Sequence, residues 1–140
     1  MRETVKVFKA LSDETRLRTL NVLLERECCV CEIMQALDIS QSKASRSLSA
    51  LYEAKFLKLR KEGLWSLYSV DREGMKEHFS RLVEVVKTAL EENKEAAQDK
   101  KRLKTASRVG TRCASDCDNN SSRIQVPDVR VDAVLKQGTK

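Results

Sequence analysis

The chain has 140 residues, of which 34% are charged and 41% apolar, and these proportions predict one domain with a modest core. No apolar run approaches the roughly 20 residues of a membrane-spanning helix, and the N-terminus lacks the apolar stretch of a signal peptide, so we expect a cytoplasmic protein. The formal net charge of +6 favours nucleic acid over a membrane as partner, because no segment joins a basic face to exposed aromatic side chains; an ordinary basic surface is the alternative.

Two short helices are predicted before the first cysteine. Apolar residues recur at helical spacing over residues 5–11. Ser12 is a suitable N-cap for a second helix, whose leucine-rich face covers residues 17–24 and which should end near Arg26. Both helices are expected to form core scaffold.

Three thiols follow within four residues, at Cys28, Cys29 and Cys31. A cytoplasmic chain is kept reduced, and five cysteines are an odd number, so a framework of structural disulfides is not expected. Thiolates are the ligands that soft ions select, so the cluster predicts a soft-ion site. The alternatives are a role as small buried apolar residues and thiol–disulfide redox chemistry.

A helix-turn-helix is predicted after the thiols. Apolar residues over 30–37 have helical spacing, and a short turn at residues 38–40 separates them from a fourth helix that Ser40 can cap. The fourth helix has a buried stripe at Ala44, Leu48 and Leu51. The second helix of such a pair enters the DNA major groove, so this motif predicts a DNA-binding protein.

The polar face of the fourth helix holds the candidate DNA-reading residues. Arg46 is the candidate for reading a base edge, because arginine to guanine is the commonest specific contact. Small or N-terminal residues suited to close approach are Gln41, Ser42, Ser45 and Ser49. Lys43, Arg60 and Lys61 are candidates for phosphate contacts. The alternative interpretation is a solvated polar face on a core helix.

A β-hairpin is predicted over residues 56–70, where apolar and polar residues alternate on either side of Lys61-Glu62-Gly63. Glycine permits positive φ at the turn. A two-stranded hairpin is marginal alone, so it must pack on the helices. Its basic residues near the tip are placed where a wing would touch phosphate.

Apolar residues repeat at helical spacing from residue 72 to about 103, which predicts one long helix. Its stripe exceeds the need of a small core, so we expect a homodimer formed through this helix with the first helix beside it. We predict a DNA-binding and dimerisation domain over residues 1–104 and a flexible C-terminal tail over 105–140 that carries Cys113 and Cys117.

Four motifs occur in a fixed order: LSDETR at 11–16, CVCEI at 29–33, SKASRSL at 42–48 and GLWSLY at 63–68. In these motifs, over roughly residues 3–95, the chain resembles the ArsR/SmtB family of winged-helix repressors. The Cys-Val-Cys-acid run is similar to the trivalent arsenic and antimony site of the arsenic-responsive branch. The sequence departs from the family pattern at three positions. Ser47 replaces the usual histidine of the fourth helix, and Lys55 replaces the glycine before the hairpin. Met34 stands where some members have a third thiol.

The resemblance implies a homodimeric winged helix-turn-helix, mainly α with a small β-hairpin. It implies a repressor that binds double-stranded operator DNA of a resistance operon and dissociates when trivalent arsenic binds three thiolates. On a regular helix Cys29 and Cys31 lie about 160° apart at about 100° per residue, so three neighbouring sulfurs could not meet at one ion. Either the first turn unwinds, or a sulfur comes from elsewhere, with Cys113 and Cys117 as candidates, within one chain or across a dimer.

Two other regulators remain open on the same scaffold. Zinc could take a tetrahedral set made of Cys28, Cys31, Cys113 and Cys117. A thiol-redox-responsive repressor is the other. An enzyme is not expected, because the thiols have no histidine nearby and no thioredoxin-like context, and the chain has no glycine-rich phosphate loop.

Overall fold

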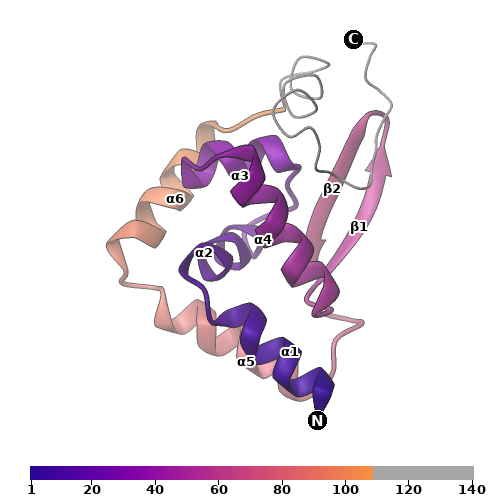
Figure 1. Ribbon diagram of the computed structural model, residues 1–140. Helices are drawn as coiled ribbons and strands as arrows, with labels where there is room; N and C mark the ends of the chain where they lie inside the picture. Colours follow the sequence, from indigo (N-terminus) through magenta and orange to yellow (C-terminus); the bar gives the residue numbers. More distant parts are fainter. Residues whose placement is uncertain (109–140) are drawn as a thin grey trace.

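The computed structural model describes residues 1–108 and shows a mainly helical protein with one antiparallel β-hairpin (Figure 1). Its elements, in chain order, are α1 (Arg2–Leu11), α2 (Glu14–Leu23), α3 (Val30–Leu37), α4 (Gln41–Glu53), β1 (Leu57–Glu62), β2 (Trp65–Val70), α5 (Glu77–Ala89) and α6 (Lys94–Thr105). The predicted fold class is confirmed. No helix within residues 1–108 is long and apolar enough to cross a membrane.

Helices α2, α3 and α4 form the centre of the molecule, and the hairpin stands along one side of them (Figure 1). Helix α6 lies against α3 on the side away from the hairpin, whereas α1 and α5 lie together at the end that carries the N-terminus. A buried apolar cluster joins these elements, and its largest members include Val7, Leu20, Ile33, Leu37, Leu48, Leu51 and Phe56. The predicted stripe on α4 is therefore part of the core.

Two tight turns agree with the sequence predictions. Between α3 and α4, Asp38 has a left-handed φ of 57°, and Ser40 Oγ accepts the N–H of Lys43 at 3.2 Å. At the hairpin turn Gly63 has a φ of 61°, which glycine adopts at little cost. Lys55, just before β1, has a φ of 73°; this conformation strains a residue with a Cβ by roughly 1–2 kcal/mol.

Helix α2 differs from the prediction at both ends. Asp13, rather than Ser12, caps the helix by accepting the N–H of Arg16 at 3.1 Å. The helix ends at Leu23 instead of near Arg26. A loop therefore precedes the thiols, and Arg26 belongs to this loop.

The single long helix predicted over residues 72–103 is wrong, because the chain forms α5 and α6 with a turn at residues 90–93. The Oδ1 atom of Asn93 accepts the N–H of Ala96 at 2.9 Å and caps a new helix. The apolar spacing continues across the break in the sequence. In the fold, however, α5 lies beside α1 while α6 turns back onto α3 (Figure 1).

A buried charge cluster holds α6 against α2 and α3. Asp99 is fully buried and accepts hydrogen bonds from Arg18 at 2.8 and 2.9 Å and from Arg102 at 3.0 Å. The same two arginines donate to the last carbonyl groups of α3, Arg18 to Leu37 at 2.9 Å and Arg102 to Ala36 at 2.8 Å. The Asp99 carboxylate thus orients two arginine side chains, and these bind the last carbonyl groups of α3 and stabilise the C-terminal end of that helix.

Asp99→Asn is expected to lower the free energy of unfolding by about 3 kcal/mol, because it leaves two arginines beside a neutral amide in a buried position. Urea unfolding followed by circular dichroism measures the change. Glu77→Gln, which breaks the exposed pair with Arg81, is the control and should leave the midpoint unchanged. Equal midpoints for the wild type and Asp99→Asn would show that the cluster does not hold α6.

Candidate functional site

The three clustered thiols lie in three different backbone environments. Cys28 pairs with Tyr68 of β2 as an isolated antiparallel bridge, with hydrogen bonds of 3.0 and 2.9 Å. Cys29 is the extended N-cap residue of α3, and only Cys31 lies inside the helix. The separation of about 160° that a regular helix would impose on Cys29 and Cys31 therefore does not apply, because α3 begins at Val30, after two of the three thiols.

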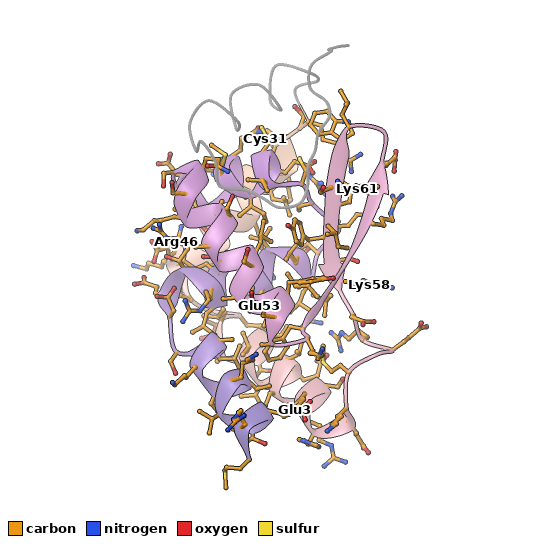
Figure 2. The ribbon with its side chains drawn as sticks, turned by 45° about the vertical axis from the view of Figure 1, so that its right-hand side comes forward. Glu3, Cys31, Arg46, Glu53, Lys58 and Lys61 are labelled. Carbon is orange, nitrogen blue, oxygen red and sulfur yellow. The ribbon has the colours of Figure 1, made fainter. Side chains whose placement is uncertain are left out.

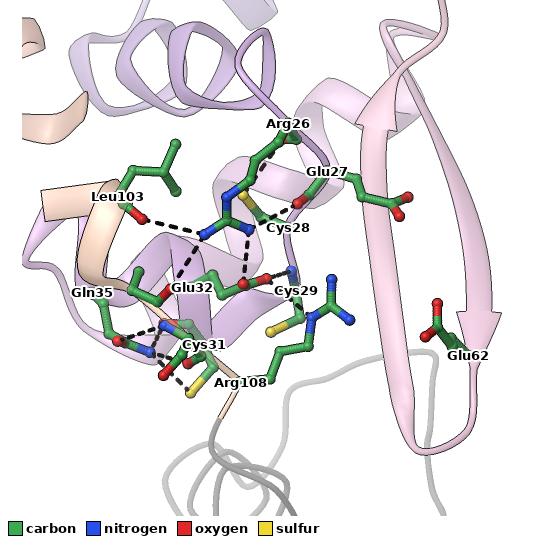
Figure 3. A network of polar contacts seen from close by, with 12 residues as sticks. Arg26, Glu27, Cys28, Cys29, Cys31, Glu32, Gln35, Glu62, Leu103 and Arg108 are labelled. Atoms are coloured by element: carbon green, nitrogen blue, oxygen red, sulfur yellow. Dashed lines mark hydrogen bonds and ion pairs between the residues drawn. The ribbon is translucent and has the colours of Figure 1, made fainter. Parts of the chain in front are cut away.

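Cys28 belongs to the core. Its side chain is 0% exposed, is part of the main apolar cluster and donates a weak hydrogen bond to the carbonyl of Arg26 at 3.6 Å. Burial raises the pKa of this thiol to about 12. Figure 3 shows the Cys28 sulfur beside Arg26, whereas the sulfurs of Cys29 and Cys31 lie nearer Arg108.

Cys29 is buried at the N-terminus of α3. Burial raises the pKa of its thiol, and the nearby Glu32 carboxylate adds to this, while the backbone N–H groups of Glu32 and Cys31 act in the opposite direction. These N–H groups are the unsatisfied donors of the helix start, and they favour negative charge on the sulfur. Once the site loses a proton, the helix start stabilises the thiolate.

Cys31 is half-buried in the first turn of α3. Its sulfur lies 3.8 Å from the Nε2 atom of Gln35, one turn further along the helix. Among the cysteines whose state the described residues define, Cys28 and Cys29 are free thiols.

The Glu32 carboxylate connects the elements around the thiols (Figure 3). It accepts the N–H of Cys29 at 2.9 Å and a charged hydrogen bond from Arg26 at 2.8 Å, and the Nε atom of Arg108 lies 3.5 Å away. Although burial opposes its ionisation, these donors outweigh burial and hold the pKa of Glu32 below its ordinary value. Sequence reasoning missed this role, yet an acid three residues after the N-cap is the spacing of a capping box.

The end of α6 docks over the same region. Arg26 also donates to the carbonyl groups of Leu103 and Ala106, at 3.3 Å each. The side-chain amide of Gln35 exchanges two hydrogen bonds with Ser107, donating to its carbonyl at 2.8 Å and accepting its N–H at 3.2 Å. We call residues 103–108 the docked segment, since it covers the thiol end of α3.

Six of the eight candidate DNA-reading residues lie on α4, and Arg60 and Lys61 lie on β1. Lys43, Arg46 and Ser49 are exposed, and Ser42 and Ser45 are half-buried; Figure 2 shows Arg46 on the outer side of α4. The prediction that Gln41 lies on this polar face is wrong, because its side chain is 2% exposed and donates to Ser45 at 2.7 Å. Gln41 therefore orients Ser45 from below the surface.

The two basic hairpin residues have different surroundings. Arg60 lies within β1, opposite Leu67, and its guanidinium is bound by the carboxylates of Glu27 at 3.0 Å and Glu62 at 2.8 Å. Hydrogen bonds to these carboxylates raise the pKa of Arg60. Lys61 lies nearer the hairpin tip and is exposed (Figure 2). Because Glu27 directly precedes Cys28, its ion pair with Arg60 connects the hairpin to the start of the thiol cluster.

The predicted tail ligands Cys113 and Cys117 lie outside the described residues. Within residues 1–108 no three or more histidine, cysteine or acidic side chains are grouped as a ready metal site. The donors that the described part offers at the helix start are therefore the sulfurs of Cys29 and Cys31. Two soft donors fit part of the coordination sphere of a soft ion.

The fold and the polar face of α4 define a winged helix-turn-helix DNA-binding protein. Residues 13–58 match the family described as bacterial regulatory protein, arsR family. Two relatives are the arsenic resistance transcriptional regulator ArsR1 of Pseudomonas putida, 48% identical over 68 residues, and the cadmium resistance regulatory protein CadC homolog of Staphylococcus aureus, 43% identical over 83 residues. A third relative, the arsenical resistance operon repressor of Bacillus subtilis, is 34% identical over 74 residues, which make up 70% of that protein. The chain therefore belongs to the arsR family of bacterial regulatory proteins.

The matched part is limited in length. The alignments cover 48% and 59% of this chain, and they span 53% and 65% of the two relatives. Among solved structures, the homodimeric winged helix-turn-helix domain of Mb0332 from Mycobacterium bovis, a possible ArsR-family regulator, aligns with a TM-score of 0.54 and 28% identity. That alignment covers 66% of this chain and 82% of the matched one.

Glu32→Gln is expected to lower the free energy of unfolding at neutral pH by about 2 kcal/mol, since it removes the charge that Arg26 binds in a buried position. Because folding lowers the pKa of Glu32, its contribution is present above its ordinary pKa of 4.5 and is lost as pH falls through the lower folded value. Urea unfolding at pH 7 and in acid should show the two proteins converging in stability as the pH falls. A difference that is constant with pH would contradict this.

Proposed function

We propose that this chain is a transcriptional repressor that binds double-stranded operator DNA as a homodimer and dissociates when trivalent arsenic or antimony binds its thiolates. The family, the arsenic-resistance relative and the thiols at the start of α3 support the proposal. The relatives are transcriptional regulators, so we do not propose an enzymatic activity. We place the repressor in the cytoplasm, where the thiols are kept reduced.

One observation carries the proposal: the loop at residues 26–29 contacts both DNA-binding parts. Cys29 caps α3, which a three-residue turn joins to α4. Cys28 is hydrogen-bonded to β2, and Glu27 pairs with Arg60 of β1. An ion that draws Cys29 toward Cys31 therefore displaces the cap of α3 and pulls on the hairpin at the same time.

Release requires that the ion bind the free repressor more tightly than the DNA-bound one. A typical coupling free energy between two sites is about 1–3 kcal/mol, which corresponds to roughly a 5- to 150-fold change in affinity. Displacing one helix cap and one short bridge is a change of this size, since a cap alone is worth about 1 kcal/mol. No large rearrangement of the core is needed.

On DNA, we propose that α4 enters the major groove. Arg46 is exposed and long enough to reach a guanine edge, and the small side chains of Ser42, Ser45 and Ser49 permit close approach. Lys43 and Lys61 contact phosphate. Arg60 does so only after exchanging a carboxylate for a phosphate, because Glu27 and Glu62 already bind it.

We propose that the dimer forms through α1 and α5. Val5, Phe8 and Val85 are 44%, 52% and 60% exposed, and they belong to these two adjacent helices. The Mb0332 domain, which shares the fold, is described as homodimeric. We keep residues 1–104 as the DNA-binding and dimerisation domain and propose residues 105–140 as a tail, whose first residues, Ala106 to Arg108, are bound to the domain by Arg26, Gln35 and Glu32.

A zinc- or thiol-redox-responsive repressor is the second candidate, because the same clustered thiols at Cys28, Cys29 and Cys31 could serve either chemistry. The arsenic-responsive repressor differs from these alternatives in the metal that the purified protein contains and in its response to an oxidant. Metal analysis of protein purified without oxygen distinguishes them, because tightly held zinc would replace arsenic as the proposed effector. Loss of operator binding on oxidation, with no effect of arsenite on the reduced protein, would favour the redox regulator.

Arsenite is expected to raise the operator dissociation constant of the reduced protein roughly 5- to 150-fold. Fluorescence anisotropy of a labelled operator measures the change. Cys29→Ser and Cys31→Ser should bind the operator as the wild type does but ignore arsenite. Arg46→Ala is the matched control: it should lose operator affinity while binding arsenite normally, and arsenite-independent operator binding by the wild type would refute the proposal.

Phe8→Glu is expected to convert the dimer to a monomer and to weaken operator binding, because a symmetric interface would bury the new charge twice. Sedimentation velocity measures the mass of the species. Tyr52→Glu is the control, since this residue is 47% exposed but lies on α4. If Phe8→Glu and the wild type sediment alike, the dimer does not use α1.

A further inference from the structure

Gln41 holds an amide at a position where an apolar side chain of the same shape would be at least as stable. Its side chain is 2% exposed, its Nε2 atom donates to Ser45 Oγ at 2.7 Å, and its Oε1 atom has no hydrogen-bond partner within residues 1–108. A buried polar atom without a partner costs free energy, and an apolar replacement removes that cost. The contribution of this amide to stability therefore does not explain its presence, and its hydrogen bond to Ser45 is what distinguishes it from an apolar side chain.

The amide of Gln41 presents its N–H to Ser45 rather than its carbonyl oxygen. The reverse placement would leave both N–H groups of the amide without an acceptor. Buried N–H groups without a partner are rarer in proteins than buried carbonyl oxygens without one. Ser45 Oγ is therefore the acceptor in this pair, and one of its lone pairs is occupied.

The hydroxyl group of Ser45 keeps its proton for a partner outside the protein. Hydroxyl groups inside helices often donate to the carbonyl group four residues earlier, as Thr19 Oγ1 does to Thr15 at 2.8 Å. In the described part of the chain, Ser45 Oγ accepts from Gln41 and donates to no protein atom. Ser45 is half-buried and directly precedes the exposed Arg46, so its O–H group is available at the surface that faces DNA in the proposed complex.

We propose that Ser45 determines base specificity as a hydrogen-bond donor, and that Gln41 is the buried residue that positions its hydroxyl group for this role. The inference rests on the proposed function, because it names how the same face of α4 selects a base. In the major groove, guanine, adenine and thymine each present an acceptor, whereas cytosine presents an amino donor. At the base that it contacts, Ser45 therefore selects against cytosine.

The other two serines of this face differ from Ser45. Within residues 1–108 no side chain binds the hydroxyl group of Ser42 or Ser49. A hydroxyl group that rotates freely can donate or accept, so it adapts to whichever base edge lies opposite. Only a hydroxyl group whose lone pair is already engaged has a preferred direction for its proton, and the contact with Gln41 gives this property to Ser45.

The test measures base preference with the full chain, reduced and without arsenite, on the DNA duplex that the wild type selects from a random library. Fluorescence anisotropy gives the dissociation constant for this duplex and for duplexes in which each base pair of the half-site is replaced in turn. Ser45→Ala should lose roughly 5-fold in affinity per half-site, the value of one hydrogen bond, and should lose its preference at one base pair. Gln41→Met, which keeps the shape of the side chain, should lose preference at the same base pair while its urea midpoint equals or exceeds that of the wild type.

The double variant Gln41→Met/Ser45→Ala should lose no more than Ser45→Ala alone, because the two residues act as one unit. Gln98→Met makes the same exchange at an exposed position on α6 and should match the wild type in affinity and base preference.

Four outcomes would overturn the inference and leave the proposed function standing. They are an unchanged base preference in Gln41→Met, losses that add in the double variant, a lower urea midpoint of Gln41→Met, and a wild-type preference for cytosine at the base pair concerned. A wild type that selects no sequence from the library would overturn the proposed function as well.

Discussion

The carboxylate of Glu32 lies buried at the start of α3, where the Cys29 N–H and the Arg26 guanidinium bind its two oxygens. A buried charge is tolerated only when paired and hydrogen-bonded, so each partner of this carboxylate is held in place. The N–H bond sets the backbone of Cys29 as the helix cap. The arginine bond brings the loop at residues 26–29 and the docked segment to the same point, and thereby determines where the thiols lie.

The covalent and hydrogen-bonded connection between the thiols, the helix-turn-helix and the hairpin is part of this geometry. Cys29 belongs to the helix-turn-helix, Cys28 to the hairpin through its bridge to Tyr68, and they are neighbours in the chain. Their surroundings differ accordingly, because the Cys28 sulfur is packed in the apolar core and the Cys29 sulfur lies at the N-terminus of α3. A site that uses Cys29 and Cys31 can therefore act on α4 without unpacking the core.

Helix α6 gives α3 a second support. At one end of α3, Asp99 holds the two arginines that bind the last carbonyl groups, and at the other end Gln35 and Arg26 hold the docked segment. Both ends of α3 are thus contacted by α6 and the docked segment that follows it.

The sequence alone was sufficient for the features that depend on local spacing: the turn between α3 and α4, the buried stripe of α4, the hairpin with Gly63, and the thiol cluster with its family resemblance. Only the tertiary structure decided that α6 folds back onto α3, that Gln41 is buried, that Arg60 is bound by Glu27, and that Cys28 and Cys29 point apart. The physical reason is that caps, turns and amphipathic periods are set by neighbours in the chain, whereas the partners of a charge or a thiol are set by segments distant in sequence, such as Tyr68 for Cys28 and Leu103 for Arg26.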